Sequence, residues 1–187
     1  MILQFLLAIV MSFALRLLNL LSFLVDAVIL KTMIHIALFE PEIAINVGSI
    51  ARTSLANNSK LHLIRPFAFR LNDKALKRSA MDYWDEVDLQ VHASFNDFFK
   101  GFEKEFETKR VFSLTTKTNR FYSEASFKDG DVFLFGPESR GLPLEIRQMT
   151  EELKIPMHKK ARSLNLAVSV GVLSFEVARQ LDYPNLS

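Results

Sequence analysis

DVFLFGPESRGLP, residues 131–143, and ELKIPMHKKARSLNLAVSVGVLSFEVARQ, residues 152–180, are the two pieces of sequence that decide the fold. Each begins with a short apolar run that predicts a strand, and each run ends at a turn that contains Gly or Pro. A strand that ends in such a loop leaves backbone N–H and C=O groups free for a ligand, and Gly lets the ligand approach closely. Two loops of this kind predict a pocket at the carboxyl edge of an α/β sheet. Two ordinary strand-to-helix turns are equally consistent with the spacing alone.

Working outward, short apolar segments alternate with helical patterns from residue 33 onward. Asn46 is expected to cap a helix that runs to Asn57, and Gly48 in its first turn is expected to keep the backbone open to close approach. Phenylalanines recur at helical spacing between Phe95 and Phe106, which favours a core stripe. Strands are expected near residues 34–39, 61–64, 89–91, 110–114, 132–135 and 153–155, and further helices near 73–78, 96–106, from 143, and 163–181. This alternation predicts an α/β domain with a mostly parallel sheet flanked by helices.

Composition narrows the function classes. The 187 residues suffice for one domain with a real core. There is no cysteine, and the four histidines are scattered singly, so we expect neither disulfides nor a metal site. Net charge is only +2, so any nucleic-acid surface must be a local patch.

The opening 32 residues differ from the rest because they are apolar almost throughout. Fifteen residues precede the first charge, Arg16, and a membrane span needs roughly 20. No basic region precedes the apolar run and no clear cleavage site follows it, so a secretory signal fits poorly. We expect residues 1–32 to be an N-terminal extension ahead of a natural start at Met33, and residues 33–187 to be the functional domain. A membrane anchor is the alternative.

Three segments carry a family resemblance: ALFEPEIAINVGSIARTSLANN (37–58), FGPESRGLP (135–143) and IPMHKKARSLNLAVSVGVLSFE (155–176). They resemble, in order and separation, the three motifs of the SPOUT-type RNA 2′-O-ribose methyltransferases. The likeness covers about Ile34 to Leu181. It is greatest to the TrmL-like branch, which methylates the wobble ribose of transfer RNA at cytidine or carboxymethylaminomethyl-uridine.

The resemblance implies properties that periodicity does not predict. They are a deep trefoil knot at the C-terminal end, a homodimer, a cytoplasmic location, S-adenosylmethionine as the methyl donor, and no metal. By resemblance, the donor-binding residues are Leu114, Gly136, Ile155, Ser163 and Leu164. The three apolar side chains among them suit the enclosure of an adenine ring, although each alone would be read as core.

By the same resemblance Arg52 is the catalytic residue. Because a guanidinium stays protonated in proteins, we expect it to clamp a phosphate and to lower the pKa of the 2′-hydroxyl by its field rather than to act as a base. A surface salt bridge is the plainer alternative. Asn46, Glu138 and Asn165 match supporting positions, where each could equally be a helix cap or a loop brace.

Two clusters of basic residues are candidates for RNA binding. One is Lys74, Lys77 and Arg78, which an i, i+3, i+4 spacing places on one helix face. The other is Lys159 and Lys160, with Arg162, beside the predicted donor pocket. Contacts of this type to phosphates position an RNA without reading its sequence.

The sequence departs from the wobble-methylating branch at a few positions. Ile45-Asn46-Val47-Gly48 stands where that branch has Pro-Asn-Thr-Gly, Ala167-Val168 where it has Ser-Asn, and Phe175 where a tyrosine is common. Two alternatives therefore stay open. One is methylation of another tRNA or rRNA position, and the other is a non-catalytic RNA-binding protein that keeps the fold.

Overall fold

The computed structural model describes residue 16, residues 34–184 and residue 186. The extension expected for residues 1–32 and the start expected at Met33 lie outside the described residues, apart from Arg16, and stay predictions. Within the part of the chain that is described, no helix has both the length and the apolar composition that crossing a membrane requires.

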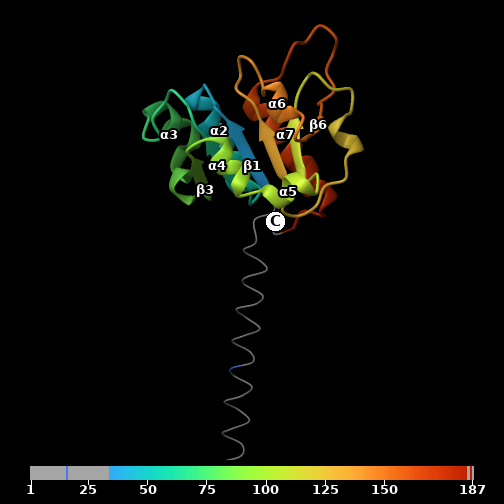
Figure 1. Ribbon diagram of the computed structural model, residues 1–187. Helices are drawn as coiled ribbons and strands as arrows, with labels where there is room; N and C mark the ends of the chain where they lie inside the picture. The colour runs from blue at the N-terminus through green and yellow to red at the C-terminus, as the bar shows by residue number, and fades with distance from the viewer. Residues whose placement is uncertain (1–15, 17–33, 185, 187) are drawn as a thin grey trace, which may run out of the picture. The chain divides into compact units, whose positions relative to one another are not determined.

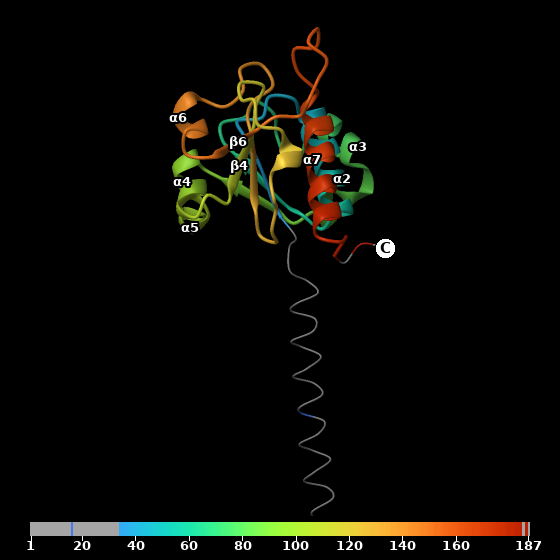
Figure 2. The ribbon, with the colours of Figure 1, turned by 90° about the vertical axis from the view of Figure 1, so that its right-hand side faces the viewer.

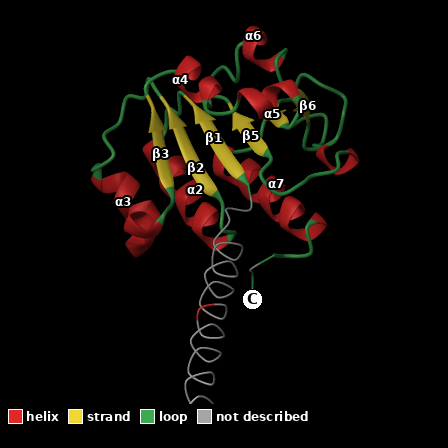
Figure 3. Ribbon diagram, turned by 60° about the horizontal axis from the view of Figure 1, so that its bottom comes forward, coloured by secondary structure: helices red, strands yellow, loops and turns green. Residues whose placement is uncertain are grey.

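Six strands form one sheet within the described residues, in the order β3-β2-β1-β5-β4-β6. Every pairing between them is parallel, and Figure 3 shows β3, β2, β1 and β5 with their arrowheads pointing the same way. In Figure 1 the sheet runs from β3 on the left to β6 on the right. The strands are β1 (His35–Phe39), β2 (Lys60–Ile64), β3 (Leu89–His92), β4 (Val111–Leu114), β5 (Val132–Phe135) and β6 (Glu151–Leu153). The prediction of a mostly parallel α/β sheet is confirmed.

Helices cover both faces of the sheet because successive residues of the strands point to opposite sides. Along β1, Ile36 and Leu38 face the core layer under α2 (Ala44–Ala56), α3 (Lys74–Ala80) and α7 (Leu166–Gln180). Ala37 and Phe39 face the layer under α4 (Phe95–Lys100), α5 (Glu103–Glu107) and α6 (Leu144–Arg147). Figure 2 shows the two groups of helices on opposite sides of the sheet. Two 3-10 turns, η1 (Met81–Glu86) and η2 (Tyr122–Glu124), complete the described elements.

The phenylalanine stripe is core, as predicted, but the single helix predicted for it is wrong. Phe98, Phe102 and Phe106 are buried against the sheet. The helix breaks at Gly101, which caps α4, and restarts after Phe102, whose backbone is not helical (φ −135°). The break turns the chain so that aromatic side chains from both short helices meet one cluster.

Three predicted boundaries are also shifted. Helix α2 begins at Ala44 with Ile43 at its cap, so Asn46 lies in the first turn and is not the cap. Helix α7 begins at Leu166, not at Ser163, because the Asn165 side chain caps it. Strand β6 ends at Leu153, so Ile155 follows the strand.

Gly48 does permit a close approach, but the approaching group is another helix. A Cβ at this position would lie 1.9 Å from Ser79 Oγ and 2.4 Å from the Leu76 carbonyl oxygen. Any side chain would therefore push α3 away from α2, and the glycine serves helix packing.

The segment that follows β4 contacts β6 on both sides. Thr115 N–H donates to the Leu153 carbonyl on the β4 side (2.9 Å). On the other side, Lys154 N–H donates to the Arg120 carbonyl (2.9 Å), and Tyr122 N–H donates to the Lys154 carbonyl (3.0 Å). The end of β6 is thus enclosed by residues 115–122.

Three histidines, one from each of β1, β2 and β3, form a hydrogen-bonded chain across the sheet. His35 Nδ1 lies 3.0 Å from His62 Nε2, and His62 Nδ1 lies 2.9 Å from His92 Nε2. His62 is buried against Phe98 and Phe102. Burial, reinforced by His35, His92 and Lys60, lowers the pKa of His62 to about 2. Burial also lowers the pKa of His35 and of His92, the latter against an opposing effect of Asp97.

We expect this chain to make the fold sensitive to acid. His62 titrates lower in the folded state than its ordinary pKa of about 6.5, so its contribution is fully present above that pH and is lost as pH falls below it. His62 alone should remove roughly 2 to 3 kcal/mol from the free energy of unfolding between pH 7 and pH 4.5. Urea unfolding across this range measures the loss. His62→Gln should reduce the pH dependence of the free energy of unfolding, and His158→Gln, in an exposed turn, should not. If this free energy changed equally with pH in wild type and in both variants, His62 would not be the source of the acid sensitivity.

Candidate functional site

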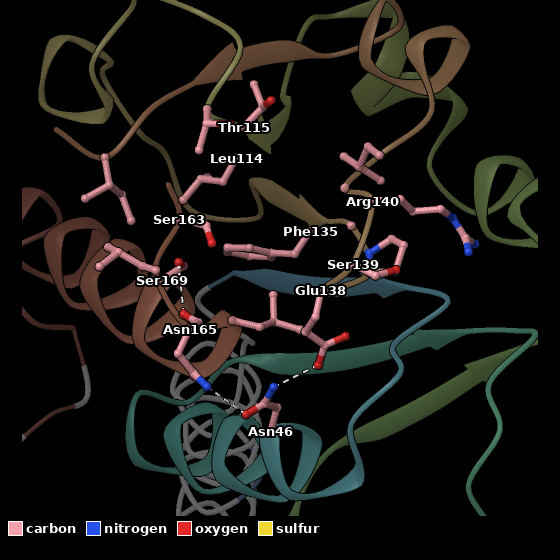
Figure 4. Close-up of a pocket in the computed structure, with 18 of the residues that line it drawn as sticks. Asn46, Leu114, Thr115, Phe135, Glu138, Ser139, Arg140, Ser163, Asn165 and Ser169 are labelled. Carbon is pink, nitrogen blue, oxygen red and sulfur yellow. Dashed lines mark hydrogen bonds between the residues drawn. The ribbon is translucent and has the colours of Figure 1, made fainter. Parts of the chain in front are cut away.

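A pocket of about 500 Å³ lies at the carboxyl ends of β4 and β5. Its walls come from the segment after β4, the segment after β5, the segment between β6 and α7, and the start of α2 (Figure 4). This is the place where an open parallel sheet leaves backbone groups free for a ligand. The volume is in the range of pockets for cofactor-sized molecules.

All five residues predicted to bind the donor line this pocket. Leu114 is the last residue of β4, and Gly136 directly follows β5. Ile155 lies two residues beyond the end of β6, and Ser163 and Leu164 precede the cap of α7. Residues separated by up to 50 positions in sequence therefore meet at one cavity, which favours a ligand site over separate core positions.

The wall beside Gly136 is a tight loop that folds back on the glycine. Gly141 N–H donates to the Pro137 carbonyl (2.9 Å), and Gly141 adopts a positive φ of 69°. A Cβ at position 136 would lie 2.3 Å from Leu142 N and 2.4 Å from the Gly141 carbonyl carbon. The loop 137–141 can therefore keep its shape only while position 136 is glycine.

A chain of side-chain amides and a carboxylate joins the three motifs. Asn46 is buried, and its Nδ2 donates to Glu138 Oε1 (2.8 Å). Asn165 Nδ2 donates to Asn46 Oδ1 (3.0 Å), as the dashed lines in Figure 4 show. Asn165 Oδ1 also accepts from Ala167 N–H (2.8 Å) at the start of α7. Asn165 is thus both a cap and a brace, while Asn46 is a brace alone.

A second connection involves Glu42, which sequence reasoning did not single out. Its carboxylate accepts from Ser139 N–H (2.9 Å) and from Ser139 Oγ–H (2.6 Å). Its own backbone N–H donates to Glu138 Oε2 (3.0 Å). The only available signal was its place in the first motif, in the loop directly before α2.

Other lining residues were also missed, and they extend the pocket on each side. Most lie in loops, for which spacing gives no signal. They include Ile43, Thr115, Thr116, Lys117, Phe135, Ser139, Arg140, Met157 and Ser169.

Arg52 does not line the pocket of its own chain. It is exposed on α2, and none of the ion pairs within the described residues involves it, so the surface salt bridge considered as the plainer alternative is absent there. Ile45, seven residues earlier, shares its face of the helix. The guanidinium is therefore free to meet a group brought to this face by another molecule.

The two basic clusters are both exposed, but they lie in different places. Lys74, Lys77 and Arg78 are on α3, which packs against α2 and does not reach the pocket. Lys159 and Lys160 lie in the segment between Met157 and Ser163, both of which line the pocket. Among residues 34–184, no group of three or more His, Cys, Asp or Glu side chains is arranged to hold a metal ion.

Comparisons with known proteins agree in pointing to one family. Residues 33–175 match the model of the SpoU rRNA Methylase family. A tRNA (cytidine(34)-2'-O)-methyltransferase of Methylovorus glucosotrophus is 43% identical over 154 residues, which are 81% of this chain and 97% of that protein. A solved structure concerned with the 2-OH methylation of C/U34 on tRNA is 47% identical, with a TM-score of 0.77, and the match covers 81% of this chain and 97% of that one.

A more distant structure shares the fold alone. The SpoU methyltransferase AviRb from Streptomyces viridochromogenes, solved with the cofactor AdoMet, is 20% identical with a TM-score of 0.72. The match covers 81% of this chain and 59% of that one.

Proposed function

The chain belongs to the SpoU rRNA Methylase family, and from this premise we propose that it is a tRNA 2′-O-methyltransferase that uses S-adenosylmethionine to methylate the ribose of nucleotide 34, the wobble position. The observation that carries the proposal is the single pocket built from the three motifs. It occurs in a chain that spans nearly the whole length of relatives named for this reaction.

The pocket suits the donor in size and chemistry. Its volume of about 500 Å³ is adequate. Leu114, Ile155 and Leu164 offer an apolar enclosure, and the strand ends offer backbone groups that can hydrogen-bond the edge of an adenine. When bound, S-adenosylmethionine would supply an electrophilic methyl group for the 2′-oxygen. The protein contributes position, since holding two reactants in line converts a bimolecular displacement into an effectively unimolecular one.

Arg52 supplies charge to the reaction. Its guanidinium carries a fixed positive charge that lowers the pKa of a nearby 2′-hydroxyl and can clamp a phosphate bidentately. The chain from Glu138 through Asn46 to Asn165 holds the start of α2, and hence the helix that carries Arg52, in register with the donor loop.

The RNA contacts fall to the two exposed basic clusters. Lys159 and Lys160 stand beside the pocket, where they can hold the phosphates next to the reacting ribose. Lys74, Lys77 and Arg78 are farther away on α3 and suit the more distant backbone of the tRNA. A tRNA substrate supports the cytoplasmic location that the family resemblance implies.

The family resemblance includes a homodimer, and one surface supports it. Ile45 on α2, and Val168 and Phe175 on α7, are 55%, 50% and 47% exposed. Val168 and Phe175 share one face of α7, and α7 packs against α2. Large apolar side chains exposed on adjoining helices are typical of an interface.

Phe175→Glu should make the protein monomeric. In a two-fold dimer both copies bring the charge into the interface, and burying an unpaired carboxylate costs about 3 kcal/mol or more, a hundredfold or more in the dissociation constant. Sedimentation velocity measures the effect, with Met149→Glu on the other side of the sheet as the matched control. A monomeric wild-type protein, or a Phe175→Glu variant that dimerises as well as wild type, would rule this surface out.

We also propose that the C-terminal region forms the deep trefoil knot of the family. The support is the enclosure of the end of β6 by residues 115–122, which hydrogen-bond it on both sides. Gln180, at the end of α7, adds to it by accepting from Phe127 N–H (3.0 Å) and donating to the Ala125 carbonyl (3.1 Å).

Methyl transfer to unmodified tRNA tests the proposed function. Purified protein, labelled S-adenosylmethionine and transcribed tRNA should give label at nucleotide 34. After alkaline hydrolysis the label should be in a dinucleotide, because a 2′-O-methyl group blocks cleavage of the adjacent phosphodiester. Label at another nucleotide would replace the wobble assignment, and the absence of label with tRNA still bound would favour a non-catalytic RNA-binding protein.

A further inference from the structure

Glu42 connects two loops that are far apart in sequence and does not itself line the pocket. It lies between β1 and α2, and both of its carboxylate oxygens accept hydrogen bonds from Ser139, 97 residues away. In return, Glu138 accepts a hydrogen bond from Glu42 N–H. The two loops thus hold each other through reciprocal carboxylate-to-amide contacts, the stronger class of hydrogen bond.

Ser139 is placed where such a hold affects the pocket. It is in the loop 137–141, which forms one wall of the cavity and folds back against Gly136. Within that loop, the Gly141 to Pro137 backbone bond closes the turn. The remaining anchors are carboxylates: Glu138 binds Asn46, and Arg140 pairs with Glu40 and, at 3.9 Å, with Glu42. Glu42 therefore contacts two residues of this loop, Ser139 and Arg140, whereas Glu40 contacts Arg140.

We propose that Glu42 is a positioning residue for the methyl donor, which acts through Ser139 by fixing the loop 137–141 before the donor binds. The inference rests on the proposed function of the pocket. A wall that is already in its bound shape saves the free energy that would otherwise be spent on ordering it. Loss of Glu42 should therefore weaken donor binding without altering the reacting groups.

The charge state of Glu42 is consistent with this role. Its pKa is lowered, first by the side-chain hydrogen bond from Ser139 and then by the backbone one. The carboxylate is therefore ionised throughout the neutral and alkaline range in which methyl transfer is assayed.

The test compares Glu42→Ala, Glu42→Gln, Ser139→Ala and the double variant Glu42→Ala/Ser139→Ala. Calorimetry with S-adenosylmethionine and its demethylated product should show about tenfold weaker binding or more for Glu42→Ala, as expected for lost charge-assisted bonds. Glu42→Gln keeps one carbonyl acceptor and should be intermediate. The double variant should be no weaker than Glu42→Ala, because both changes remove one interaction. Glu145→Gln, an exposed change on α6, is the matched control and should bind as wild type does.

Kinetics separates positioning from a merely structural role. For Glu42→Ala, KM for the donor should rise while kcat at saturating donor, KM for tRNA and the melting temperature stay near wild type. A rise in both KM values together with a fall in kcat and in the melting temperature would overturn the inference in favour of a structural role. Equal donor affinity in wild type and Glu42→Ala would overturn this inference and leave the proposed function intact. If wild type did not bind the donor, the proposed function and this inference would both be overturned.

Discussion

Gly136→Val should abolish donor binding while the rest of the fold survives. The reason is local, because even a Cβ at this position would lie 2.3 Å from Leu142 N and 2.4 Å from the Gly141 carbonyl carbon. Both atoms are backbone, so they cannot move aside as a flexible side chain can. The loop 137–141 must shift, and with it the wall that Ser139 and Arg140 contribute to the pocket.

The matched control is Gly171→Ala in the middle of α7, where an added Cβ meets nothing within 4 Å. Calorimetry with S-adenosylmethionine should show no binding for Gly136→Val, a loss of at least a hundredfold for Gly136→Ala, and wild-type binding for Gly171→Ala. Circular dichroism of each variant checks that the protein is folded. A folded Gly136→Val protein that binds the donor as wild type does would show that the loop does not form part of the site.

Arg52→Ala should lower turnover about a hundredfold while donor affinity stays near wild type. Loss of a preorganised charge at a reacting centre commonly costs about 3 kcal/mol of transition-state stabilisation, or roughly a hundredfold in rate. Because Arg52 lies outside the pocket of its own chain, its removal should not disturb the donor. Single-turnover rates at saturating tRNA, set beside calorimetry of the donor, measure the two quantities separately.

Arg52→Lys separates two ways in which the residue could act. It keeps the charge and loses the planar fork of the guanidinium. Wild-type turnover in Arg52→Lys would exclude bidentate clamping and leave a field effect, and full turnover in Arg52→Ala would make the residue structural. Lys74→Ala/Arg78→Ala is the contrast: it should weaken tRNA binding and flatten its salt dependence by about one unit of slope per lost contact, with turnover at saturating tRNA retained.

The strands and the pocket could be predicted because their signals are local. Val132–Phe135 is a short apolar run of β-prone residues that ends at Gly136-Pro137, and these features together are typical of a buried strand. Once the strands alternate with helices, their carboxyl ends must share one edge. That is enough to bring Leu114 and Gly136 together, as the pocket shows.

The parts that could not be predicted depend on contacts between distant segments. The sequence places the start of α7 at Ser163 and leaves Asn165 as either a cap or a brace, whereas in the structure Asn165 is both, because Asn46 of α2 also holds its side chain. Apart from its place in the first motif, Glu42 gave no signal, because its partner, Ser139, is 97 residues away. The histidines look scattered in sequence, but adjacent parallel strands bring His35, His62 and His92 into one chain.

Mapping ribose methylation in total RNA, with and without this gene, tests the central claim most directly. The account predicts that 2′-O-methylation disappears at nucleotide 34 of one or more tRNAs, that other positions are unchanged, and that wild-type protein restores it while Arg52→Ala does not. Unchanged methylation at every tRNA and rRNA position, or a loss confined to positions other than 34, would contradict it.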